Sequence, residues 1–169
     1  MKKLFFLIVA IISVFNASAQ EIDSSLVQSA EIPIDSLSIR LNKLQHDYDF
    51  MYCDYELHKL LMDLKDLSHS IGSSSNGVLI NFFNSRYDHA LYNTYLDSYD
   101  AYSALLNSLK ESIETTQMAV LIKVASSGFS DAELNVLGSS LNTIKKAVTS
   151  VEASLNYYDA TIKAYRSKR

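Results

Sequence analysis

The chain has 169 residues, and its composition alone excludes several classes of protein. It is 48% hydrophobic but contains only 4 Gly and 1 Pro, which fits neither a disordered nor a fibrous chain and favours long helices over a turn-rich β fold. Its net charge of −4 disfavours nucleic acid and anionic membranes as partners. We therefore expect an all-α protein with one domain after its leader.

The first 19 residues are typical of a cleaved signal peptide. Lys2 and Lys3 precede an apolar stretch of about 12 residues, too short to cross a bilayer. The segment ends on Ala17 and Ala19, the positions that signal peptidase reads. Cleavage after Ala19 removes two of the 15 basic residues and none of the 19 acidic ones, which leaves a charge of −6. We expect export to the bacterial envelope, in the periplasm, or to the extracellular medium. We expect no membrane span in the mature chain.

Residues 20–33 are polar and lack a clear period, so we expect an exposed leader before the first helix. Residues 34–169 should then form the single helical domain. Cys53 is the only cysteine, so no disulfide within the chain can stabilise it.

Two clusters of turn-forming residues, at 72–77 and 126–129, interrupt the helical periodicity of this domain. They predict helices at about 34–71, 78–125 and 131–168. Short connections between long helices most simply give an antiparallel up-down-up bundle of three helices with coiled-coil-like seams.

The third helix has the clearest pattern. Ser130 and Glu133 match a capping box, Phe129 can pack on Leu134 as a hydrophobic staple, and Gly128 can close the preceding helix in a left-handed conformation. The apolar residues then alternate steps of three and four without a miss. They are Leu134, Leu137, Leu141, Ile144, Val148, Val151, Leu155, Tyr158, Ile162 and Tyr165.

The first helix carries two overlapping apolar seams, so its apolar face is wide enough to contact two neighbours at once. One seam consists of Leu37, Leu41, Leu44, Tyr48, Met51 and Tyr55. The other consists of Phe50, Cys53, Leu57, Leu60, Leu64, Leu67 and Ile71.

A turn near residues 74–75 would place tyrosines from all three helices at one height, among acidic residues. An ordinary bundle core whose phenols reach water at the rim is the common reason for such an arrangement. The alternative is a pocket for a cationic or planar ligand, formed by the aromatic faces and their acidic neighbours. The candidate ligand-binding residues are Tyr52, Tyr55, Tyr95, Tyr99 and Tyr158.

The same register sets His58 level with His89, which makes this pair a candidate metal site. No Glu-x-x-His or His-Glu-x-x-His motif supports it, and solvated surface histidines explain the pair equally well. The chain also lacks a Gly-x-Ser-x-Gly elbow, a Ser-x-x-Lys pair and a phosphate-binding loop. We therefore predict no catalytic residue and no cofactor.

The predicted middle helix is longer than its neighbours, which leaves apolar side chains uncovered at both of its ends. Phe82, Phe83, Leu121 and Ile122 are the candidate interaction residues. The sequence thus favours an exported helical bundle with a protein-interaction or structural role, through a protein partner or self-association. A bundle that binds a small ligand or a metal is the alternative.

Overall fold

A computed structural model describes residues 34–84 and 86–169 of the chain. It contains three helices: α3 (Ile34–Asn84), α4 (His89–Ser127) and α5 (Asp131–Arg166). The predicted signal peptide and leader lie outside these residues. The chain divides into two compact units, residues 1–43 and residues 44–169, and the bundle is the second unit.

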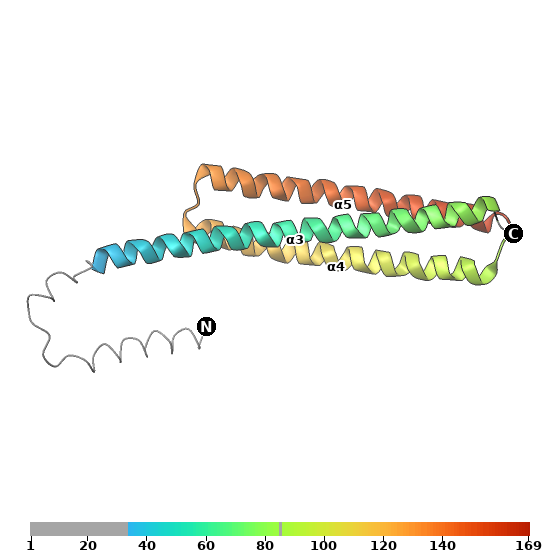
Figure 1. The fold of residues 1–169 in the computed structure, drawn as a ribbon, viewed down its shortest axis with the longest axis horizontal. Helices are drawn as coiled ribbons and strands as arrows, with labels where there is room; N and C mark the ends of the chain where they lie inside the picture. Colours follow the sequence, from blue (N-terminus) through green and yellow to red (C-terminus); the bar gives the residue numbers. More distant parts are fainter. Residues whose placement is uncertain (1–33, 85) are drawn as a thin grey trace, which may run out of the picture. The chain divides into compact units, whose positions relative to one another are not determined.

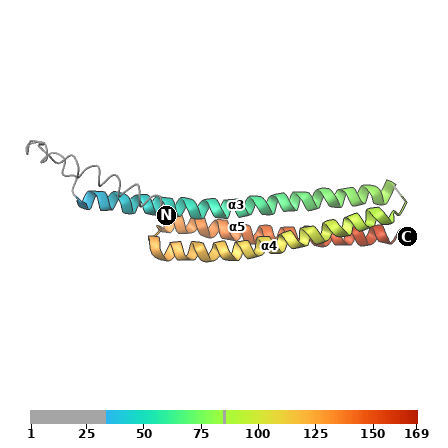
Figure 2. The same ribbon diagram turned by 90° about the horizontal axis from the view of Figure 1, so that it is seen from below.

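The expected all-α three-helix bundle is confirmed. Within the second unit the three helices run side by side, with α3 and α5 pointing one way and α4 the other (Figures 1 and 2). The described residues include no strand. None of the described helices is apolar over a length sufficient to cross a bilayer.

The predicted turn at residues 72–77 is wrong, because α3 continues through it to Asn84. Ile71, Ser75 and Val78 stay on the buried side of the helix, and Ser75 Oγ donates to the Ile71 carbonyl oxygen at 2.9 Å. Gly72 and Gly77 each disfavour a helix by about 1 kcal/mol. Burial of Ile71 and Val78 contributes roughly 1.5 to 3 kcal/mol each, which outweighs that penalty.

The first turn lies instead between Asn84 and His89. Asp88 caps α4: its carboxylate accepts hydrogen bonds from the backbone N–H groups of Ala90 and Leu91, at 2.8 and 3.1 Å. Such an Asp is a helix-start signal that needs no glycine. The shift changes the pairing of α3 with α4 by about 25 residues, or roughly seven turns.

At the second turn, the predicted left-handed glycine and the predicted capping box are confirmed. Gly128 has a left-handed backbone with φ of 62°, and Ser130 and Glu133 form the capping box of α5. The Phe129 ring packs edge-on against Phe50 of α3, with centroids 5.9 Å apart. This aromatic contact brings α3 against the α4–α5 turn.

The core follows one seam of each helix. On α3 it is the predicted second seam, extended by Ser75 and Val78 beyond the supposed turn. The prediction that the middle helix is longer than both of its neighbours is wrong, because α4 has 39 residues whereas α3 has 51, and α4 exceeds the 36 residues of α5 only slightly. The fully buried large side chains are Leu57, Leu64, Ile71, Val78, Leu137, Ile144, Val151, Tyr158, Ile162 and Tyr165.

Candidate functional site

The predicted tyrosine layer does not form. Tyr95 and Tyr158 are buried between α4 and α5, where the Tyr158 hydroxyl donates to the Tyr95 carbonyl oxygen at 3.3 Å. Tyr99 is half-buried near them on α4. Tyr52 and Tyr55 are exposed on α3, in the half of the bundle that holds the α4–α5 turn. The misplaced first turn explains the error, because it set the wrong part of α4 beside these two residues.

The buried tyrosines instead close the core near the α3–α4 turn. The Tyr165 ring packs against Tyr87 and Tyr95, with centroids 5.6 and 5.5 Å away. The Tyr165 hydroxyl accepts from the Asp88 backbone N–H at 3.1 Å, and the Tyr95 hydroxyl accepts from Asn81 at 2.6 Å. Burial raises the pKa of Tyr158. These phenols are therefore bonded to the chain itself, as expected of core tyrosines.

The two candidate metal ligands are also far apart. His58 lies midway along α3, whereas His89 opens α4 beside the end of α3. The 26 residues of α3 between His58 and Asn84 correspond to about 39 Å along the helix axis. Residues 34–84 and 86–169 contain no group of three or more His, Cys, Asp or Glu side chains placed to hold a metal ion.

Sequence analysis did not identify a buried polar group that joins α3 to α4, which we call the Asp49 junction. Lys123 Nζ and Ser127 Oγ of α4 donate to opposite oxygens of the Asp49 carboxylate at 2.6 and 2.7 Å, and Gln45 adds a third bond at 3.0 Å. Asp49 is only 4% exposed. The hydrogen bond from Lys123, followed by that from Ser127, lowers the Asp49 pKa despite burial. Asp49 lies four residues before Cys53, on the buried face of α3, but its partners Lys123 and Ser127 are more than 70 positions away in the sequence.

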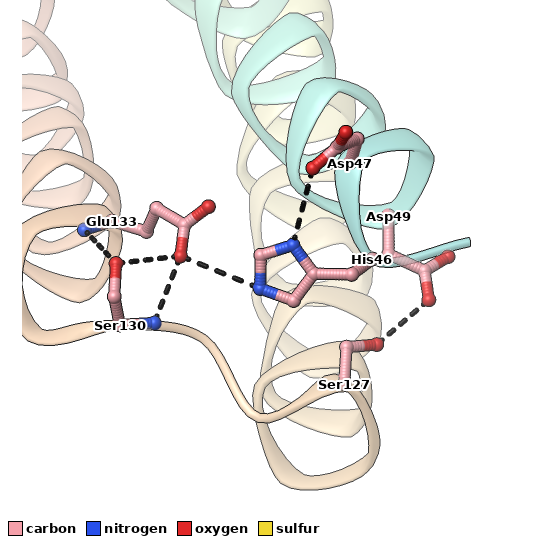
Figure 3. A network of polar contacts seen from close by, with 6 residues as sticks. All are labelled: His46, Asp47, Asp49, Ser127, Ser130 and Glu133. Atoms are coloured by element: carbon pink, nitrogen blue, oxygen red, sulfur yellow. Dashed lines mark hydrogen bonds and ion pairs between the residues drawn. The ribbon is translucent and has the colours of Figure 1, made fainter. Parts of the chain in front are cut away.

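A second polar contact joins α3 to α5 at the same end of the bundle (Figure 3). His46 Nε2 lies 3.5 Å from Glu133 Oε2, and that carboxylate also accepts from the backbone N–H and the hydroxyl of Ser130. The hydrogen bonds from Ser130 lower the Glu133 pKa. The helix cap of α5 is thereby tied to α3.

These polar groups favour a structural role. The Asp49 carboxylate is shielded from solvent and fully engaged by α4 and by its own helix. Cys53, one turn further along α3, is buried, and burial raises the pKa of its thiol. A protonated, enclosed thiol is a poor nucleophile.

The first predicted seam of α3 is the main unexplained feature. An α-helix turns about 100° per residue, which places this seam on the side of α3 opposite the buried one. Its side chains are exposed by 62% at Tyr48, 68% at Met51 and 63% at Tyr55. We call Leu44, Tyr48, Met51, Tyr55 and Met62 the outer stripe, all of them exposed and all in the second unit. Leu37 and Leu41, in the first unit, are exposed as well.

The four predicted interaction residues differ in exposure. Phe83 is 76% exposed, and Leu121 and Ile122 are 58% and 63% exposed. Phe82 is half-buried, with Lys168 Nζ 4.6 Å from its ring centroid. Phe82 and Phe83 end α3, whereas Leu121 and Ile122 lie on α4 near its other turn, so the four do not form one surface.

Comparison with protein-family models, with curated proteins and with solved structures found no match to this chain.

Proposed function

We propose that this protein is an exported helical bundle that acts by binding protein. The observation that carries the proposal is the outer stripe, whose large apolar side chains are exposed on a well-packed bundle. Apolar residues on two opposite faces of one helix are typical of a helix that is covered on both sides. Contiguous exposed apolar surface usually marks a place of interaction.

Export rests on the pattern of residues 1–19. A purified mature protein that begins at Gln20 would support it. Recovery from the cytoplasm of a chain that still begins at Met1 would contradict it.

The geometry does not support the alternative function, binding of a small ligand or a metal, because the tyrosines and histidines on which it depended lie apart.

Photo-crosslinking in the native host tests the binding role. A benzophenone amino acid at Tyr55 should give a crosslinked protein adduct on illumination, because that side chain is 63% exposed within the outer stripe. The same probe at Asn156, an exposed polar residue of α5, is the matched control. Absence of an adduct from Tyr48, Met51 and Tyr55 alike would contradict the proposed function.

A further inference from the structure

We propose that the occupant of the outer stripe is a second copy of this chain, which pairs α3 with α3 in a parallel coiled coil. This inference rests on the proposed function and names the partner. It concerns residues 44–62, which lie within the second unit and within α3.

The spacing of the stripe is that of a coiled-coil seam. Leu44, Tyr48, Met51, Tyr55 and Met62 alternate steps of four and three, with His58 at the one polar position between the last two. In heptad terms Tyr48, Tyr55 and Met62 occupy a positions, and Leu44, Met51 and His58 occupy d positions. The seam runs for about 27 Å, or between two and three heptads.

The flanking charges make the stripe complementary to a parallel copy of itself. Asp54 occupies a g position and Lys59 the following e position, the pair that meets across a parallel coiled coil. Neither residue forms an ion pair within the described part of the chain. Two-fold symmetry would create this opposite-charge contact twice.

An antiparallel pairing over the same residues is less favourable. It would set Leu44 opposite Met62 of the second copy and would bring the two Asp54 side chains together near the symmetry axis. Like charges at that position disfavour the arrangement. The charge pattern therefore selects the parallel orientation.

The bundle removes two usual obstacles to so short a coiled coil. α3 is already folded by its packing against α4 and α5, so pairing does not have to nucleate a helix. Because the stripe lies opposite the buried seam, α4 and α5 lie away from the second copy. With roughly 100 Å² exposed for each large side chain, the stripe offers on the order of 500 Å² per copy, near the lower limit for a specific interface. We therefore expect a weak, concentration-dependent dimer.

Sedimentation equilibrium on the mature chain, residues 20–169, tests whether a second copy of the chain covers the outer stripe. The protein should pass from monomer to dimer over a hundredfold concentration range. Tyr55→Glu should weaken the dimer at least tenfold without altering the helical dichroism. Leu121→Glu, an exposed apolar residue of matched exposure on α4, should leave the dimer unchanged.

A cysteine at the end of the stripe tests the orientation. Leu44→Cys should form a disulfide-linked dimer on mild oxidation, because parallel pairing sets the two residues face to face within the 4.4 to 6.8 Å between Cα atoms that a disulfide requires. Antiparallel pairing would separate them by about 27 Å. The unmodified chain is the control, since its single thiol at Cys53 is buried.

Several results would overturn the inference: a monomer at every concentration, a dimer lost in Leu121→Glu but kept in Tyr55→Glu, or dimers of Leu44→Cys that do not crosslink. A chain that dimerises only after residues 20–33 are deleted would show that the leader is the occupant instead. If the stripe crosslinks to a protein of another mass, the inference of self-association is wrong, but the proposed protein-binding function still holds. If the stripe crosslinks to no protein, both the inference and the proposed function are wrong.

Discussion

Lys123 of α4 lies 2.6 Å from the carboxylate of Asp49 on α3, which places an ion pair between residues 74 positions apart in the sequence. Asp49 is buried, whereas the Lys123 side chain remains 34% exposed. The contact fixes the register of α3 against α4 at the end of the bundle that bears the outer stripe.

Asp49→Asn should lower the free energy of unfolding by about 2 kcal/mol, because it removes a charged acceptor that serves two donors from α4. Chemical denaturation at pH 7 measures the loss. Asp47→Asn, on a neighbouring side chain that is 52% exposed, should change stability by less than about 0.5 kcal/mol. Equal effects of the two substitutions would show that the Asp49 junction contributes no more to the free energy of unfolding than an exposed Asp does.

The stability conferred by Asp49 should depend on pH in a defined direction. Its folded pKa is below the ordinary value of 3.8, so its contribution is fully present above about pH 4 and is lost as the pH falls through the folded value. The stability gap between the wild type and Asp49→Asn should therefore be constant from about pH 7 to 5 and shrink below about pH 4. A gap that widened on acidification would contradict the assignment.

Ser130→Ala should destabilise the bundle by about 1 kcal/mol, because the hydroxyl accepts from the Glu133 backbone N–H at the start of α5. Thermal or chemical unfolding measures the change. Ser126→Ala is a suitable control, since that exposed hydroxyl only donates to carbonyl groups of its own helix. An unchanged melting temperature in Ser130→Ala would count against the cap.

Gly72→Ala and Gly77→Ala should each stabilise the protein by up to about 1 kcal/mol, because both positions are helical and an added Cβ would lie within 4 Å of no atom of another helix. Gly128→Ala should have the opposite effect, of about 1 to 2 kcal/mol, since its φ is 62°. Denaturation midpoints distinguish the three variants. Destabilisation by either of the first two would mean that α3 is interrupted at residues 72–77.

Cys53 should resist alkylation in the folded protein, because it is buried and its thiol pKa is raised. Labelling with iodoacetamide at pH 8 should proceed only as fast as the protein opens, and urea should accelerate it strongly. Rapid labelling without denaturant would show that this part of α3 is accessible.

The sequence was sufficient to predict the fold class and the α4–α5 turn, because Gly128, Ser130 and Glu133 act locally. It was insufficient for the first turn, where local and tertiary preferences conflict. Gly72 and Gly77 suggest a break, but the burial of Ile71 and Val78 keeps α3 continuous. That single error displaced the pairing with α4, and with it the tyrosine layer and the pairing of His58 with His89.

Both seams of α3 were recognisable from their spacing, but the spacing did not show which seam is buried and which is exposed. A periodic pattern shows which residues share a face, whereas the number of neighbours decides which face is covered. Among residues 34–84 and 86–169, the helices that cover α3 are α4 and α5, and they bury the seam that contains Leu57 and Leu64. The seam that contains Tyr48 and Tyr55 remains exposed. The Asp49 junction depends on contacts between distant residues, for which the sequence has no local signal.

The distribution of tyrosines gives each end of the bundle its own spectroscopic signal. The chain has 11 tyrosines and no tryptophan, so its near-ultraviolet absorption and its emission come chiefly from phenol rings. Tyr95, Tyr158 and Tyr165 are buried in the interior toward the α3–α4 turn, and they should dominate the near-ultraviolet dichroism. Tyr48 and Tyr55 face solvent in the other half, where their emission should respond to whatever covers them. Loss of dichroism would then report melting of one end, while quenching by a dissolved agent such as iodide would report access to the other, without any introduced label.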